Sequence, residues 1–191
     1  MNTKKLTLTI VFAALTVALN PAISRIGVPA PYAPFLIYGL WEIPIIAAFL
    51  LIGSKSGIAV TALNAIVLFA FYPGPLPTGP LYNFIAIIST LAAVFFAYKF
   101  LNRDSQNAKN QAILVTASTA LGIVFRVVVM TVVNYVTLRY DYPIGFSMPE
   151  AAVVGFLPAG ALFNGTVVLY SIPIAYIITR AVKNNVRLNL T

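Results

Sequence analysis

Long apolar runs separated by short polar segments constrain this chain more than any other feature of its sequence. Of its 191 residues, 60% are hydrophobic and only 8% are charged, whereas a soluble domain carries roughly 25% charged residues. A helix needs about 20 predominantly apolar residues to cross the hydrocarbon core of a bilayer. The sequence therefore predicts an all-α, multi-pass protein of the plasma membrane, with residues 1–191 forming a single integral membrane domain.

Six apolar segments are predicted to be transmembrane helices. Their approximate bounds are 6–22, 41–53, 58–72, 81–101, 111–138 and 150–181. The segment Gly53–Gly57 is predicted to form a tight turn between the second and third helices. Pro158 and Pro173 lie inside the sixth segment and leave open whether that helix is continuous.

The basic residues predict how these helices are oriented. With the N-terminus in the cytoplasm, nine Lys and Arg residues fall on inner segments and only Arg25 and Arg139 on outer ones, as the positive-inside rule requires. Both termini are therefore predicted to be cytoplasmic. The apolar N-terminal run has no small-residue cleavage site before Ser24, so it is expected to remain as the first helix. The proline-rich segment 23–40 is then a long first outer loop that folds over the membrane domain.

The residue types present exclude several kinds of chemistry. The chain has no Cys and no His, which excludes disulfides, thiolate catalysis, Cys/His metal sites and histidine acid–base catalysis. It has no phosphate-binding Gly-rich loop, no nucleophile elbow and no close pair of acids in one span. The net charge of +8 is spread between apolar runs and not clustered as nucleic-acid binding requires. We therefore expect no enzymatic activity, no cofactor and no ability to power transport without an ATPase.

Several polar residues interrupt the predicted helices and are candidates for a binding site. Arg126, Met130 and Asn134 share one helical face, and the two polar groups are about 12 Å apart along the axis. A charge at this depth is unfavourable unless it faces protein or a water-filled cavity. Asparagine amides both donate and accept hydrogen bonds, so several of them can read the edge of a flat heterocycle in a mostly apolar pocket. The candidate substrate-binding residues are Glu42, Asn64, Asn83, Arg126, Asn134 and Asn164.

Packing roles are the alternative for each candidate. Asparagines within the membrane often bond a neighbouring helix. Arg126 can pair with a carboxylate, for which Glu42 is suitable if it lies deep enough, and Glu42 also suits the positively polarised start of a helix. Ala14 and Ala18 form a small-xxx-small pattern that lets another helix approach closely, and we expect a partner to bind there.

Four segments of the chain resemble the S components of energy-coupling factor (ECF) vitamin transporters, which are their substrate-binding membrane subunits. The similarity is greatest to the riboflavin-specific members. The segments are WEIPIIAAFLLIGSKSGIAVTALNAI (Trp41–Ile66), GPLYNFIA (Gly79–Ala86), RVVVMTVVNYVTL (Arg126–Leu138) and LPAGALFNGTVVLYSIPIAYII (Leu157–Ile178). Each motif is loose, but the four follow one another in the order found in that family.

The resemblance implies that a vitamin, with riboflavin the first candidate, binds in the outer half of the bundle under the first loop, which acts as a gate. It implies that Asn134, its neighbour Tyr135 and Asn164 contact the ligand. It also implies that the Ala14 and Ala18 face meets a transmembrane coupling subunit, which is bound to two ATPase subunits.

One position departs from the family pattern. Members usually have a lysine three residues after the asparagine that corresponds to Asn164, but here that residue is Val167. Arg126 is then either a substitute cation or a structural one. Two other functions stay open: an S component for another vitamin or heterocyclic precursor, and an accessory membrane subunit that transports nothing.

Overall fold

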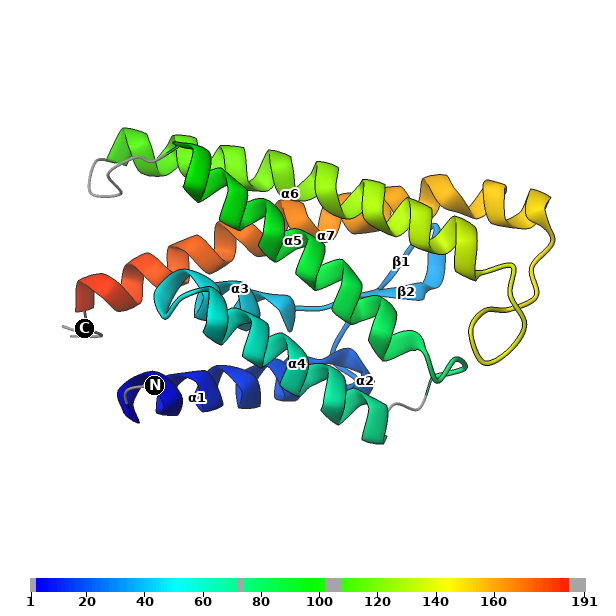
Figure 1. Ribbon diagram of the computed structural model, residues 1–191, viewed down its shortest axis with the longest axis horizontal. Helices are drawn as coiled ribbons and strands as arrows, with labels where there is room; N and C mark the ends of the chain where they lie inside the picture. The colour runs from blue at the N-terminus through cyan, green and yellow to red at the C-terminus, as the bar shows by residue number, and fades with distance from the viewer. Residues whose placement is uncertain (1–2, 72–73, 102–107, 186–191) are drawn as a thin grey trace.

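Helices dominate the computed structural model, which describes residues 3–71, 74–101 and 108–185. In chain order the elements are α1 (Thr3–Leu19), α2 (Pro21–Ser24), β1 (Val28–Ala30), β2 (Ala33–Tyr38), α3 (Glu42–Leu51), α4 (Ser54–Phe71), α5 (Gly79–Leu101), α6 (Ala108–Thr137) and α7 (Glu150–Asn185). The long helices run roughly along one axis, and α1 begins at the same end of the bundle at which α7 ends (Figure 1). Both ends of the described chain therefore lie on one side, as the basic residues predict. That this side is cytoplasmic stays a prediction.

Four helices, α4 to α7, are long and apolar enough to cross a membrane, so the chain is a mostly helical, multi-pass membrane protein. The helix α7 extends without interruption over 36 residues, with Pro158 and Pro173 inside it, which answers the question of continuity. The segment predicted as the second span forms α3, which has only 10 residues. At 1.5 Å per residue α3 is about 15 Å long, half the thickness of a hydrocarbon core of about 30 Å. The six-span topology therefore stays a prediction.

The short helix α3 lies at the centre of the bundle. Its residues from Glu42 to Ala48 are all buried, and it packs against α1, α4 and α7. A helix that is apolar on all sides is suited to such an interior position. The turn that follows is shorter than the predicted Gly53–Gly57, because α4 already begins at Ser54. Of the two glycines of the predicted turn, Gly53 adopts a positive φ of 126°, whereas Gly57 lies within α4, where a Cβ would be 2.6 Å from Cβ of Phe49.

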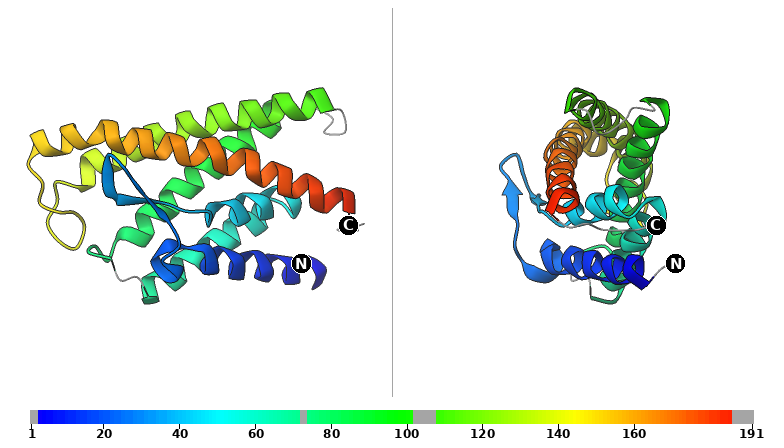
Figure 2. Two further views of the ribbon diagram at one scale, coloured as in Figure 1. Left: turned by 180° about the vertical axis from the view of Figure 1, so that it is seen from behind. Right: turned by 90° about the vertical axis from the view of Figure 1, so that its left-hand side faces the viewer.

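The segment predicted to be the first outer loop contains a β-hairpin, so the all-α fold class is wrong in this segment. Strand β1 pairs with β2 in antiparallel register, with Val28 opposite Tyr38. The prolines at 29, 31 and 34 disfavour a helix here, and pairing the two strands satisfies backbone groups that would otherwise be left without partners. The hairpin lies beside α7 at the margin of the bundle (Figure 2).

Aromatic contacts attach the hairpin to α7. The ring of Tyr38 lies 4.8 Å from that of Phe163 and 6.4 Å from that of Tyr170. Near the tip of the hairpin, Phe35 packs on Phe156 at 5.8 Å between ring centroids. Strand pairing and aromatic packing against α7 account for the position of the hairpin, and its covering of the membrane domain stays a prediction.

Candidate ligand-binding site

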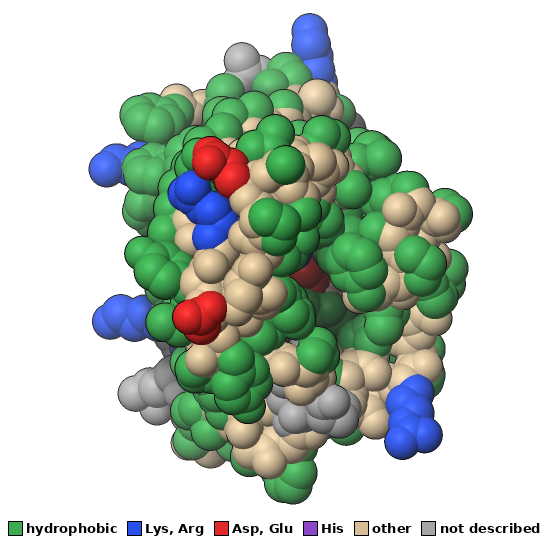
Figure 3. Space-filling model, turned by 90° about the vertical axis from the view of Figure 1, so that its right-hand side faces the viewer, with side chains coloured by type: hydrophobic (Ala, Val, Ile, Leu, Met, Phe, Trp, Pro, Cys, Tyr) green, Lys and Arg blue, Asp and Glu red, His purple; other side chains and the backbone are tan. Residues whose placement is uncertain are grey.

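A cavity of about 870 Å³ opens at the end of the bundle opposite the start of α1. Its walls come from the α1–α2 junction, α2, the hairpin, the start of α3, the start of α5, α6, α7 and the α4–α5 and α6–α7 connections. Seen from this end, the surface is hollowed and an acidic side chain lies inside the hollow (Figure 3). Its volume is within the range of small-molecule sites, about 300–1,000 Å³.

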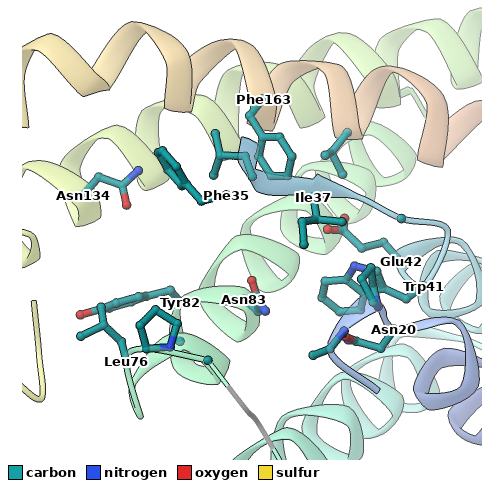
Figure 4. Close-up of a pocket in the computed structure, with 18 of the residues that line it drawn as sticks. Asn20, Phe35, Ile37, Trp41, Glu42, Leu76, Tyr82, Asn83, Asn134 and Phe163 are labelled. Carbon is teal, nitrogen blue, oxygen red and sulfur yellow. The ribbon is translucent and has the colours of Figure 1, made fainter. Parts of the chain in front are cut away.

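The cavity wall is mainly aromatic and aliphatic. Seven aromatic residues line it: Phe35, Trp41, Tyr82, Phe146, Phe156, Phe163 and Tyr170. Phe35 and Phe163 lie on one side of the space and Tyr82 lies across from them, with Trp41 deeper in (Figure 4). Aromatic faces placed on two sides of a cavity suit a flat, aromatic ligand, because rings pack well in offset or tilted arrangements.

Three asparagines supply most of the neutral polar groups in this wall. Asn83 on α5 and Asn134 on α6 point their amides into the space between the helices (Figure 4). Asn20, at the junction of α1 and α2, lines the cavity as well. Its amide oxygen accepts a hydrogen bond from the Ala22 backbone N–H and its amide nitrogen donates to Asn64 at 3.4 Å. Amides spaced around an apolar cavity can hydrogen-bond the edges of a heterocycle.

A buried ionic network forms the base of the cavity. Arg126 donates from Nη1 and Nη2 to the two carboxylate oxygens of Glu42, at 2.5 and 2.8 Å, and from Nε to Oδ1 of Asn164 at 2.8 Å. The three side chains come from α6, α3 and α7, and the side chains of both Arg126 and Glu42 are 4% exposed. Two parallel N–H···O bonds are the favoured geometry between a guanidinium and a carboxylate. The pair is therefore neutral overall, as a site buried within the membrane requires.

Glu42 has a second reason to be at this position. It is the first residue of α3, where the free backbone N–H groups and the helix dipole favour a negative charge. The sequence alternatives for Glu42, a helix-start role and a pair with Arg126, are thus both present in the structure. Of the two sequence interpretations of Arg126, these contacts favour the structural one.

The predicted site residues fall into two groups. Glu42, Asn83, Arg126 and Asn134 line the cavity. The others do not line it: Asn64 bonds Asn20, Asn164 lies behind Arg126 and also donates to the Gly160 carbonyl, and the Tyr135 hydroxyl donates to Glu150 at 2.9 Å. The predicted polar face of the fifth span is confirmed, since Arg126 and Asn134 both reach the cavity and Met130 between them is buried.

Sequence reasoning missed several residues of the wall. Asn20, Trp41 and Tyr82 line the cavity but are not among the predicted substrate-binding residues. Phe35 and Phe163 carried no signal, because single aromatics in apolar segments are common. Asn20-Pro21 is a helix-end signature, and it was the one available clue that an amide lies at the end of α1 that reaches the cavity.

Hydrogen bonds between loops close one side of the cavity. Oγ1 of Thr78 donates to the Pro143 carbonyl at 2.8 Å, and the Tyr82 hydroxyl donates to the Ile144 carbonyl. These contacts join the end of the α4–α5 connection and the first turn of α5 to the α6–α7 connection. On the other side, the Tyr170 hydroxyl donates to the Gly39 carbonyl at 2.7 Å and holds the end of the hairpin.

The predicted partner face lies outside the cavity. Ala14 and Ala18 are exposed on α1, whereas their neighbour Ala13 is buried against the core. The small side chains thus face away from the bundle, as a helix–helix contact with another protein would require. Binding of a partner there stays a prediction.

Comparison with known proteins supports the fold. A scan of protein-family models and a search of curated proteins found no match. A solved structure described as the S component of a bacterial ECF transporter is similar over 98% of this chain and 100% of its own length. The TM-score is 0.74 and the sequence identity is 22%. The chain therefore has the fold of that S component.

Proposed function

We propose that this protein is the substrate-binding S component of an ECF-type importer and that its ligand is a flat heterocyclic vitamin, with riboflavin the first candidate. One observation carries the proposal: a cavity of about 870 Å³ lined by aromatic side chains and asparagine amides in a chain with an S-component fold. The aromatic wall supports a ring system, and Asn83 and Asn134 support recognition of its polar edge.

Binding and release require the first outer loop to move. The hairpin contributes Phe35, Leu36 and Ile37 to the cavity wall, and its contacts with α7 are aromatic packing and one hydrogen bond. Such contacts can break and reform without disturbing the helical core. The hairpin is therefore proposed to be the gate, and the α6–α7 connection, tied to Thr78 and Tyr82, the fixed wall.

Transport requires other subunits. The sequence has no ATP-binding motif, so the energy must come from two ATPase subunits through a transmembrane coupling subunit. The exposed Ala14 and Ala18 on α1 are proposed to contact that coupling subunit. The S component binds and carries its ligand and performs no chemical step.

Ligand binding can be tested directly on purified protein. When riboflavin is added to the protein in detergent, the fluorescence of the flavin should be quenched, and the titration should give a saturable 1:1 isotherm. The thermal unfolding temperature of the protein should rise, because a ligand that binds only the folded state stabilises it by mass action. A panel of other vitamins serves as the control. Unchanged flavin fluorescence and unfolding temperature at high riboflavin concentration would reject riboflavin as the ligand.

One observation favours a different heterocycle as the second candidate. Val167, at the position where the family usually has lysine, lines the cavity and is 3% exposed. The wall there is apolar where a cation is expected. A different vitamin or precursor that raises the unfolding temperature, while riboflavin does not, would establish this candidate. If no small molecule binds, the accessory-subunit alternative is favoured.

A further inference from the structure

The two ends of the cavity differ in charge. At the base, Glu42 neutralises Arg126 through two hydrogen bonds. At the mouth, Arg25 lines the cavity, and its side chain has no ion pair or hydrogen bond among the residues that the structure describes. Arg25, Glu42 and Arg126 are the charged residues of the wall. The wall therefore has one uncompensated positive charge, and it lies at the outer end.

Arg139, the other basic residue of the predicted outer segments, does have partners within the protein. Arg139 lies over the ring of Tyr135, with 4.2 Å between its guanidinium carbon and the ring centroid, and its Nη1 is 3.9 Å from Glu150. It does not line the cavity. On the hollowed face, basic side chains lie beside acidic ones near one margin (Figure 3). Arg25 is thus the outer cation that is available to a ligand.

The backbone holds Arg25 in an uncommon conformation. Asn20 caps the start of α2, and Arg25 ends this helix with a φ of 58° and a bond from its backbone N–H to the Pro21 carbonyl. Residues other than glycine rarely adopt a positive φ, and Asn or Gly would form this helix end with less strain. The backbone conformation therefore gives no reason for an arginine at position 25, so we look for the reason in what its side chain binds.

We infer that Arg25 binds an anionic group, a phosphate or a carboxylate, on the outward end of the ligand. This inference rests on the proposed function. The ring system lies against the aromatic wall and the neutral base, and the acidic tail reaches the mouth, where a guanidinium can bind two of its oxygens. The substrate class is therefore an acidic or phosphorylated heterocycle and not only its uncharged form.

Lipid phosphate offers the same chemistry at the mouth. An interfacial arginine also attracts anionic headgroups, so the test has to separate the two sources. Riboflavin and riboflavin 5′-phosphate form a suitable pair of probes because they share one ring system and differ in the charge of the tail. Nanodiscs made of zwitterionic lipid, or of the same lipid with an anionic fraction, vary the headgroup independently.

The experiment measures the affinities of both flavins for the wild-type protein, for Arg25→Ala and for the matched control Arg139→Ala. In zwitterionic nanodiscs at low salt, Arg25→Ala should weaken binding of the phosphate form about five- to tenfold, as expected for loss of a partly exposed charge-assisted bond. The affinity of Arg25→Ala for riboflavin should stay within about twofold of the wild-type value. Arg139→Ala should bind both flavins as the wild type does. The loss of affinity of Arg25→Ala for the phosphate form should become smaller as the salt concentration rises.

Two results would overturn the inference while leaving the proposed function intact. The first is that Arg25→Ala loses affinity for both flavins equally, or for neither, while the wild type binds riboflavin. The second is an unchanged flavin phosphate affinity together with reduced retention of anionic lipid, which would assign Arg25 to the headgroups. Failure of the wild type to bind either flavin would overturn the proposed function with its flavin ligand, and this inference with it.

Discussion

Arg126 and Glu42 form a bidentate ion pair, with bonds of 2.5 and 2.8 Å, that joins α6 to α3 beneath the cavity. Because Asn164 accepts the third bond from Arg126, one network connects three helices at the depth where the ligand cavity ends. The network lies between the cavity and the apolar part of the bundle that contains the remainder of α3.

We predict that breaking this pair destabilises the protein. Glu42→Gln or Arg126→Met leaves one charge buried without its partner, which costs about 3–5 kcal/mol in buried pairs. The thermal unfolding temperature of the protein in detergent should fall strongly in each single variant. It should fall less in the double variant Glu42→Gln/Arg126→Met. Arg139→Ala, at an exposed arginine, is the control. A double variant less stable than both single variants would contradict the prediction.

The asparagines of the cavity wall should affect affinity more than stability. Asn134→Ala and Asn83→Ala each remove a ligand hydrogen bond worth about 1 kcal/mol, or roughly fivefold in affinity. Asn164→Ala should in contrast lower the unfolding temperature, because it leaves Nε of the buried Arg126 without its acceptor. Isothermal titration and thermal unfolding on the same samples separate the two effects. Tyr135→Phe, outside the cavity wall, should retain wild-type affinity.

The hairpin contact with α7 should set the rate of ligand release. Tyr170→Phe removes the hydrogen bond to the Gly39 carbonyl while the ring that faces Tyr38 is kept. Loss of one such bond is worth about 1 kcal/mol, so dissociation should accelerate about fivefold in stopped-flow experiments. Thr166→Val, which removes a hydroxyl bonded only within α7, is the matched control. An unchanged dissociation rate in Tyr170→Phe would argue against the hairpin as the gate.

A bulky residue on the exposed face of α1 should block transport and spare binding. Ala14→Trp and Ala18→Trp keep helices from approaching closely, yet both positions face away from the core. Vitamin uptake by cells that express the complete transporter should fall to background, whereas the purified variants should bind ligand normally. Leu162→Trp, on the exposed face of α7, is the control. Normal uptake by both α1 variants would remove this face from the partner contact.

Much of the helical architecture was predictable from local sequence. The apolar runs predicted the bounds of α5 and α6 to within three residues. The hairpin was not predicted, because its strands are short and rich in proline, and their pairing depends on packing against Phe163 and Tyr170 of α7. The sequence could not predict that Phe35 lines the cavity, because its position depends on how the hairpin packs against α7.

The sequence by itself determined that this chain is a helical membrane protein, and that one helix carries Arg126 and Asn134 on a single polar face. Hydropathy and the helical repeat are local properties, so they can be read from consecutive residues. Only the tertiary structure decided which groups these side chains meet. Arg126 and Glu42 are 84 residues apart in the chain, and the packing of α3 between the other helices brings them together. The same packing turned Asn164 toward Arg126 and left Asn134 facing the cavity.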